Sequence, residues 1–219
     1  MYNYSMDNYK KALEIIESIN ENTSKEEIYV IANKAYNISN RCEKAIIILS
    51  RLEDNFFRKE RILVDGINNA KDQYEIKYEL AILYYRSGMY KKSLAYFEEI
   101  YSDRKELNVL YFLMHIYCLF EDDKINDLYR DCIKNIEDTS FVRLSFTYLI
   151  YLYKQCRFEE VKGLLRKINK LNPYILKVLC KEEINETTKI VKEAYTVVKN
   201  NSYLINGIES FIDYLVSVC

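Results

Sequence analysis

His115 is the single histidine of the chain and the natural starting point for any catalytic or metal-binding chemistry. Cys118 follows three residues later, on the same face of a predicted helix, and Cys132 can approach from the next helix. Two thiolates and an imidazole can hold zinc, and a cysteine beside a histidine can act as a nucleophile. No fourth ligand and no local sequence signature of cysteine enzymes accompany them. Because free cysteines are common core residues, we expect these three side chains to be packed inside, with no metal and no cofactor.

Paired carboxylates and glycine-rich loops are the other features that can support catalysis. Asp122-Asp123 and Glu159-Glu160 lie where predicted links meet predicted helices. Acidic residues there favour the positive end of the helix dipole, which explains them without acid–base chemistry. The four glycines never cluster, so no phosphate-binding loop exists. We therefore expect that the protein is not an enzyme.

The composition predicts a soluble, all-helical protein. Of 219 residues, 49% are apolar and 30% charged, with one proline and four glycines, which is too few turn residues for sheets. The net charge of −1 provides no basic field for nucleic acid, and it disfavours a membrane-surface role. No secretory leader and no apolar run of 18 residues is present, and the six cysteines form no CxxC pair. We expect a cytoplasmic location with reduced thiols and no membrane partner.

Apolar residues recur at intervals of three and four along most of the chain, which predicts successive amphipathic helices. Links rich in Asn, Asp and Ser separate them and can cap their first turns. The predicted helices span residues 3–20, 24–38, 41–53, 55–70, 74–87, 90–102, 107–120, 122–137, 140–155, 157–170, 185–199 and 202–217.

These helices pair into a repeat. The best unit contains Tyr78, Leu80, Ala81, Tyr84, Gly88, Tyr90, Leu94 and Phe97. This pattern resembles the tetratricopeptide (TPR) repeat, whose period is 34 residues. Two periods beyond Gly88 the chain reaches Cys156, and the arrangement recurs around it. First-helix positions keep one spacing in four units: Cys42, Ile46 and Leu49; Ile76, Leu80 and Leu83; Leu110, Met114 and Tyr117; Leu144, Tyr148 and Tyr151.

The resemblance covers residues 40–173 and, more loosely, the first forty. A finer resemblance is to the TPR proteins related to suppressor of tumorigenicity seven. The segments that carry it are 35–49, 62–67, 88–94 and 171–174, although the proline-containing stretch that usually follows is absent here. We expect an α-solenoid with about five helix pairs over 1–173, followed by C-terminal capping helices over 174–219.

In TPR proteins the first helix of each pair lines a concave groove that binds peptides, so the resemblance implies a protein or peptide partner. The groove positions taken from the family are Arg41, Lys44, Arg51, Tyr78, Ile82, Tyr85, Arg86, Phe112, Ile116, Phe120, Phe146, Ile150, Tyr153 and Lys154. The first unit is basic and suits a carboxylate or acidic segment. The later units are aromatic and aliphatic and suit apolar anchors. TPR proteins that bind the C-terminal tails of chaperones also use asparagines at these positions. No asparagine occurs among the mapped positions, and a chaperone tail is therefore a disfavoured ligand.

Large exposed apolar surfaces usually mark interfaces, so we expect this groove to be covered. One hypothesis is an external peptide or amphipathic helix, and the other is the chain's own C-terminus. The last two predicted helices can cap the array or join two copies, so the protein is expected to be a monomer or a homodimer. The function predicted is a scaffold or adaptor, and the alternatives are a regulatory sensor of peptides and a module for homo-oligomerisation.

Overall fold

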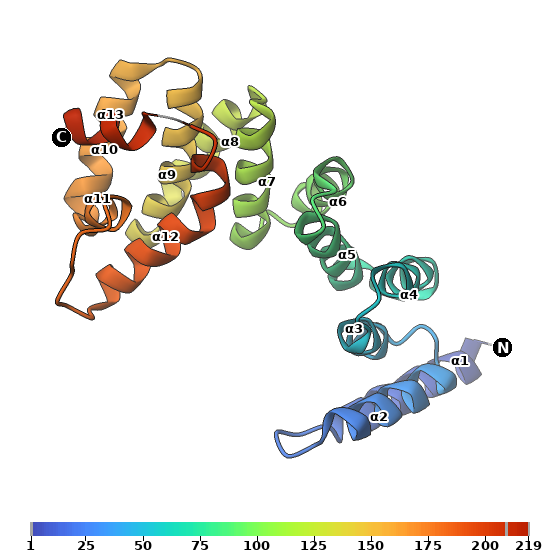
Figure 1. The fold of residues 1–219 in the computed structure, drawn as a ribbon. Coiled ribbons are helices and arrows are strands. Elements are labelled where there is room, and N and C mark those ends of the chain that lie inside the picture. Colours follow the sequence, from blue (N-terminus) through green and yellow to red (C-terminus); the bar gives the residue numbers. More distant parts are fainter. Residues whose placement is uncertain (1, 209, 219) are drawn as a thin grey trace. The chain divides into compact units, whose positions relative to one another are not determined.

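The computed structural model describes residues 2–208 and 210–218, and in that part of the chain every regular element is a helix. The predicted all-α class is confirmed, and consecutive helices pack against each other in antiparallel pairs, as expected of an α-solenoid (Figure 1). The chain forms two compact units that divide between Lys105 and Glu106. The expected boundary at residue 173, where repeats would give way to capping helices, stays a prediction.

Unit 1, up to Lys105, consists of three helix pairs. Its helices are α1 (Tyr2–Glu17), α2 (Lys25–Ile38), α3 (Glu43–Leu52), α4 (Phe56–Asn69), α5 (Tyr74–Arg86) and α6 (Tyr90–Asp103). Besides its partner, α3 contacts both α1 and α5, so the first helices of successive pairs lie next to one another. This is the packing that a stack of repeats requires.

Small residues allow close approach between helices in unit 1. A Cβ atom on Gly66 of α4 would lie 2.6 Å from the Ile46 side chain of α3, so glycine is required at that crossing. In the third pair, buried Ser93 of α6 donates a hydrogen bond of 2.9 Å to the Ala81 carbonyl of α5. The Ser93 bond joins α5 and α6 at the two small positions of the repeat pattern, Ala81 and Ser93.

Unit 2, from Glu106, contains α7 (Leu107–Phe120), α8 (Lys124–Cys132), a 3₁₀ turn η1 (Ile133–Asn135), α9 (Asp138–Lys154), α10 (Phe158–Leu171), α11 (Tyr174–Leu179), α12 (Lys189–Ile205) and α13 (Phe211–Ser217). The pairs α7–α8 and α9–α10 continue the repeat order. The helix α12 packs against α7, α9 and α11, as Figure 1 shows.

The C-terminal helices differ from those predicted. The expected break near residues 200–201 is absent, because α12 continues through both asparagines to Ile205. Asn201 is buried and its amide donates to the Val197 carbonyl at 2.9 Å, so it belongs to the helix interior. The short helix α11, between Tyr174 and Leu179, was not predicted.

Four helices end in the same turn. After α5, α7, α9 and α11 the chain passes through a left-handed residue, with φ of +73°, +55°, +56° and +55° at Gly88, Glu121, Cys156 and Lys181. In each turn the following amide bonds to the carbonyl five residues before it, as Arg157 N does to Leu152 O at 2.9 Å. This double-bonded ending is the Schellman motif. Its recurrence supports the register in which Cys156 corresponds to Gly88.

Candidate peptide-binding surfaces

The predicted basic positions of unit 1 lie at the surface. We call Arg41, Lys44, Arg51 and Arg86 the basic face; all four are exposed. Arg51 of α3 donates to Glu79 of α5 through Nε at 3.0 Å, which links the two neighbouring helices. Arg41, Lys44 and Arg86 form no ion pair with any residue that the structure describes. Three cations of this face are therefore available to an anionic partner.

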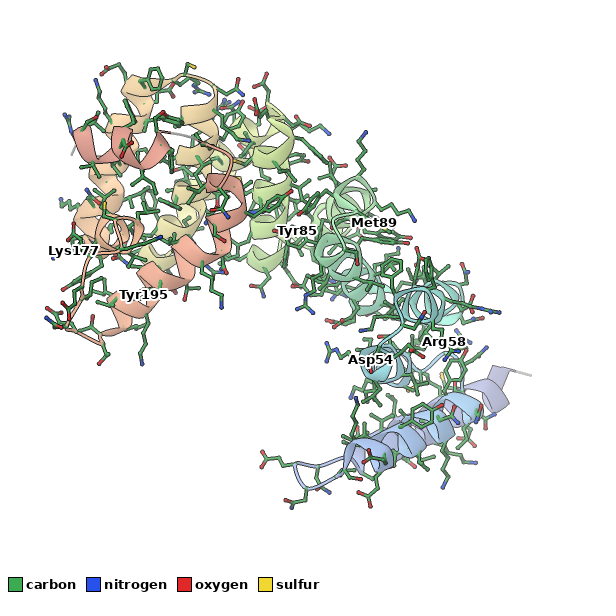
Figure 2. All side chains as sticks on the ribbon, in the orientation of Figure 1. Asp54, Arg58, Tyr85, Met89, Lys177 and Tyr195 are labelled. Carbon is green, nitrogen blue, oxygen red and sulfur yellow. The ribbon has the colours of Figure 1, made fainter. Side chains whose placement is uncertain are left out.

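The aromatic and aliphatic positions of α5 are half-buried. The Tyr78 ring meets the Phe97 ring of α6 edge-on, with centroids 6.1 Å apart. The Tyr85 ring, labelled in Figure 2, meets Tyr90 in the same way at 5.6 Å. Each ring is thus held by the partner helix while part of its surface stays accessible, as does part of Ile82.

The equivalent positions of unit 2 are covered by the chain itself. Ile116 of α7 and both Phe146 and Ile150 of α9 have no exposed surface. The stripe of α9 that carries Phe146 and Ile150 also carries Thr147, whose hydroxyl donates to the Asn201 side chain of α12 at 2.8 Å. The helix α12 packs on both α7 and α9, and these positions are closed to a peptide in this structure. Sequence patterns left open whether the C-terminal helices lie here.

Tyr153, at the end of α9, is enclosed by α10 and α13. Its ring lies 5.7 Å from Phe158, 5.0 Å from Phe211 and 5.2 Å from Tyr214, measured between centroids. Its hydroxyl is 3.2 Å from the Ser210 hydroxyl. Tyr153 therefore anchors the C-terminal segment to the repeats.

The remaining predicted residues of unit 2 have separate roles. The Lys154 ammonium pairs with Glu121 at 3.4 Å and also donates to the Cys118 carbonyl. It therefore holds the end of α9 to the end of α7. Phe112 is half-buried, whereas 41% of the Phe120 side chain is exposed. Phe120 alone of these apolar positions in unit 2 remains largely open to solvent.

Unit 1 also contains a polar cleft of about 590 Å³ that the sequence reasoning missed. Tyr9, Glu43 and Lys77, which line it, are spaced by 34 residues and so occupy one repeat position in three pairs. The Tyr9 hydroxyl donates to Glu43 at 2.7 Å, and Lys77 pairs with Glu99 at 2.7 Å. The 34-residue spacing was the signal that could have identified it. The rest of the lining is Lys71, Asp72, Gln73, Tyr74, Ile100, Asp103 and Arg104.

His115, Cys118 and Cys132 were expected to lie in the core, and this is confirmed for His115 and Cys118. Cys118 has no exposed surface and His115 is 8% exposed, whereas Cys132 is half-buried. Burial raises the pKa of Cys118 to about 12 and lowers the pKa of His115 to about 4. At neutral pH the thiol is therefore protonated and the imidazole is neutral. Within the described residues, no three His, Cys, Asp or Glu side chains are grouped as metal ligands.

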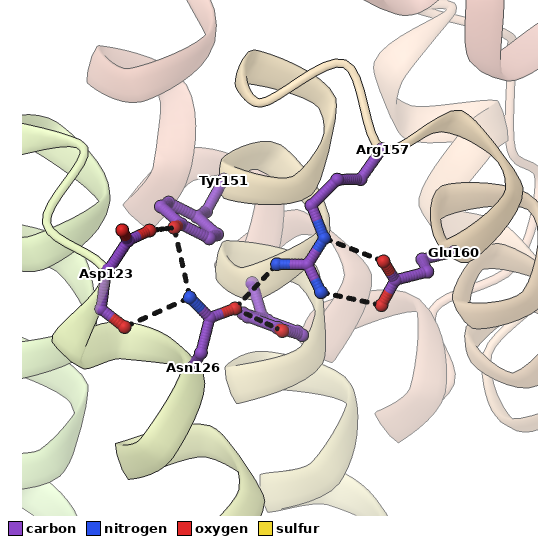
Figure 3. Close-up of polar contacts among 6 residues, drawn as sticks. Asp123, Asn126, Tyr151, Arg157 and Glu160 are labelled. Atoms are coloured by element: carbon purple, nitrogen blue, oxygen red, sulfur yellow. Dashed lines mark hydrogen bonds and ion pairs between the residues drawn. The ribbon is translucent and has the colours of Figure 1, made fainter.

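The most connected polar cluster of unit 2 centres on Asn126 of α8 (Figure 3). Its amide nitrogen donates to the Tyr151 hydroxyl at 3.1 Å and to the Asp123 carbonyl at 3.0 Å. Its amide oxygen accepts from the Tyr148 hydroxyl at 2.8 Å and from Arg157 at 2.7 Å. Two donor and two acceptor sites are all that an asparagine side chain has, so Asn126 is saturated.

This cluster joins helices and does not provide a proton-transfer site. Arg157 holds Glu160 of α10 through two bonds of 2.7 Å, and this pairing raises the pKa of the guanidinium and lowers that of the carboxyl. Burial and the bond to Asp123 raise the pKa of Tyr151 to about 12. Near neutral pH, Arg157 therefore stays charged, Glu160 stays ionised and Tyr151 stays protonated. The cluster connects α8, α9 and α10.

No helix in the described part of the chain combines the length and the apolar character that crossing a bilayer requires. Comparison with known proteins assigns no family: no family model matches the chain. A search of curated proteins likewise returns no significant match.

Proposed function

We propose that this protein is a TPR-type helical repeat protein that binds a segment of a partner protein on the basic face of unit 1. It acts without catalysis, as a cytoplasmic scaffold or adaptor. Three features support the TPR assignment: the consecutive helix pairs, the shared left-handed turns, and the small residues Ala81 and Ser93 at a helix crossing. The half-buried rings of Tyr78 and Tyr85 supply apolar contacts beside the cations.

The observation that carries this proposal is the position of α12 in unit 2. An amphipathic helix, with buried Val191, Ala194, Val197 and Leu204, lies against the first helices of two successive pairs. The repeat surface of this chain thus accommodates a helix that presents an apolar stripe. In unit 1 the first helices α3 and α5 also pack together, but their predicted groove positions are exposed or half-buried. We infer that a helix from another protein takes the corresponding place there.

The charges of the basic face define that partner. Arg41, Lys44 and Arg86 have no ionic partner among the residues that the structure describes. An acidic helix can pair with them, and each guanidinium can accept a carboxylate through two parallel hydrogen bonds. Apolar residues of the same helix would contact Ile82 and Tyr85. A nucleic acid is disfavoured because the net charge of the whole chain is −1.

Capture of partners by the full chain tests the proposal. Wild-type protein and a Lys44→Glu/Arg86→Glu variant are used as bait in lysate of the native host, and bound proteins are identified by mass spectrometry. The matched control is Lys34→Glu/Lys91→Glu, which reverses two exposed lysines outside the face. We expect a partner with an acidic helical segment that the control retains and the face variant loses at least tenfold.

A synthetic peptide of that segment should then bind purified wild-type protein directly, with affinity that falls as salt rises. Equal capture by the face variant and by the control, with unchanged helical content by circular dichroism, would refute the assignment of the site. Loss of capture in both variants would point to overall charge instead of the face and would equally contradict it.

A further inference from the structure

One side of α12 packs against α7 and α9, and its opposite side faces solvent. The residues on that side are spaced by three, four and four positions, so they form one stripe of the helix. We call Lys192, Tyr195, Lys199 and Tyr203 the α12 ridge. All four are exposed, Tyr195 by 50% and Tyr203 by 58%, and Tyr195 is labelled in Figure 2. At 1.5 Å per residue the ridge is about 16 Å long.

The two lysines of the ridge lack an ionic partner in the described part of the chain. Neither Lys192 nor Lys199 forms an ion pair with a described residue, and the nearest acidic residue in sequence, Glu193, is half-buried and faces Arg143 and Lys189. Lys177 of α11, which packs on α12, is exposed, and the link from α11 to α12 carries exposed Lys181 together with exposed Glu182, Glu183 and Glu186. The ridge therefore presents two lysines that no described carboxylate pairs with, although the chain as a whole carries a net charge of −1.

The ridge is also rigidly supported. The opposite side of α12 is buried, and Asn201 is tied to Thr147 of α9 by a hydrogen bond of 2.8 Å. At the start of α12, the Ile190 carbonyl accepts a bond of 3.0 Å from Asn172. A ligand on the ridge therefore meets side chains on a fixed backbone, and less conformational entropy is lost on binding.

We propose that the α12 ridge is a second docking surface, separate from the basic face, and that its ligand is an acidic helical segment of a partner protein. Lys192 and Lys199 are about 10 Å apart along the helix. Carboxylates seven residues apart on a partner helix have the same separation. Tyr195 lies between the two lysines in sequence and can pack against an apolar residue placed between those carboxylates. Tyrosine is one of the residues enriched at the hot spots of protein interfaces.

The same features favour a protein ligand over a nucleic acid. Affinity for nucleic acid grows with the number of phosphates neutralised, and the ridge supplies two lysines. Its exposed tyrosines gain more from apolar side chains of a partner helix than from a charged phosphate backbone.

Binding of a designed probe to the full chain carrying Lys44→Glu/Arg86→Glu tests the proposal, because these two changes remove the site for acidic helices proposed on the basic face. All ridge and control variants are made in this parent. The probe is a fluorescein-labelled helical peptide with glutamates seven residues apart and leucines between them, measured by fluorescence anisotropy. We expect Lys192→Glu/Lys199→Glu to weaken the affinity at least tenfold and Tyr195→Ala to weaken it at least threefold. The control Lys34→Glu/Lys91→Glu should change it less than twofold. Thermal unfolding of each variant shows whether the fold is kept.

Competition then distinguishes the ligand classes. A peptide of the same design with lysine in place of glutamate should not compete with the probe, and neither should a twelve-nucleotide RNA or phosphatidylserine vesicles. Equal affinity of the folded ridge variant and its Lys44→Glu/Arg86→Glu parent would overturn the proposal. Stronger binding of the RNA or the vesicles at the ridge, lost in the same variant, would also overturn it by showing a phosphate surface. In the wild-type background, where the basic face is intact, Lys192→Glu/Lys199→Glu should leave capture through unit 1 unchanged.

Discussion

Two residues in the same repeat turn should respond in opposite directions to substitution. Gly88 and Cys156 both adopt a left-handed backbone, with φ of +73° and +56°, after α5 and α9 respectively. A side chain in that region costs about 1–2 kcal/mol, whereas glycine loses about 0.5–1 kcal/mol more conformational entropy on folding. We therefore expect Cys156→Gly to raise the free energy of unfolding by about 0.5–1 kcal/mol. Gly88→Ala should lower it by about 1 kcal/mol, because no atom lies within 4 Å of the added Cβ and the penalty is conformational.

Urea unfolding followed by circular dichroism measures both changes, with the slope of the transition checked for each variant. The matched control is Cys156→Ala, which removes the thiol but leaves a Cβ atom in the left-handed turn. Cys156→Ala should leave the stability close to that of the wild type. If Cys156→Ala stabilises the protein as much as Cys156→Gly does, the thiol and not the backbone is responsible, and the reasoning fails. A loss of stability in Cys156→Gly would equally contradict the shared-turn interpretation.

Three further predictions concern unit 2. Because the pKa of His115 is lowered from 6.5 to about 4 in the folded state, the unfolded state binds its proton first as the pH falls. The free energy of unfolding should therefore fall by up to about 3 kcal/mol as the pH drops from 6.5 to 4. In urea titrations over that range, His115→Leu should show a smaller fall. Asn126→Ala should cost about 2 kcal/mol, measured by urea unfolding, because it removes four hydrogen bonds. Leu204→Ala, in the buried stripe of α12, should cost about 3 kcal/mol and increase the rate of proteolysis at residues 180–188.

The helical repeats were predictable because their signal is local. Apolar residues at intervals of three and four fix which side of each helix is buried, and this pattern placed α4 within one residue at each end. The end of α12 was not predictable from the same rules, because two successive asparagines usually favour a link. Asn201 stays helical because Thr147, 54 residues away in sequence, satisfies its side chain. The local sequence pattern around Asn201 cannot reveal a hydrogen-bond partner so distant in the sequence.

The candidate sites divide in the same way. Exposure of Arg41, Lys44, Arg51 and Arg86 agrees with the repeat register, since charged side chains rarely lie fully buried. The sequence pattern could not show whether Ile116, Phe146 and Ile150 are exposed or buried. Apolar residues are required there both for a groove that awaits a ligand and for one that is filled by the chain itself. Periodicity alone therefore cannot distinguish an open groove from a covered one.

The two faces differ in chemistry, which favours a permanent cover on unit 2 and the removable partner that we propose for unit 1. Leaving Ile116, Phe146 and Ile150 exposed would cost about 1.5–3 kcal/mol for each side chain, so unit 2 gains stability from a helix held on the same chain. In unit 1 the repeat positions equivalent to Phe146 and Tyr153 include Lys44 and Arg51 on α3. Their charged ends stay in water while their stems cover part of the apolar surface. A surface of this kind is stable without a ligand, and a partner that binds it must compete with water for the cations. Binding on unit 1 should therefore be reversible and sensitive to salt, whereas α12 should remain docked at any salt concentration that preserves the fold.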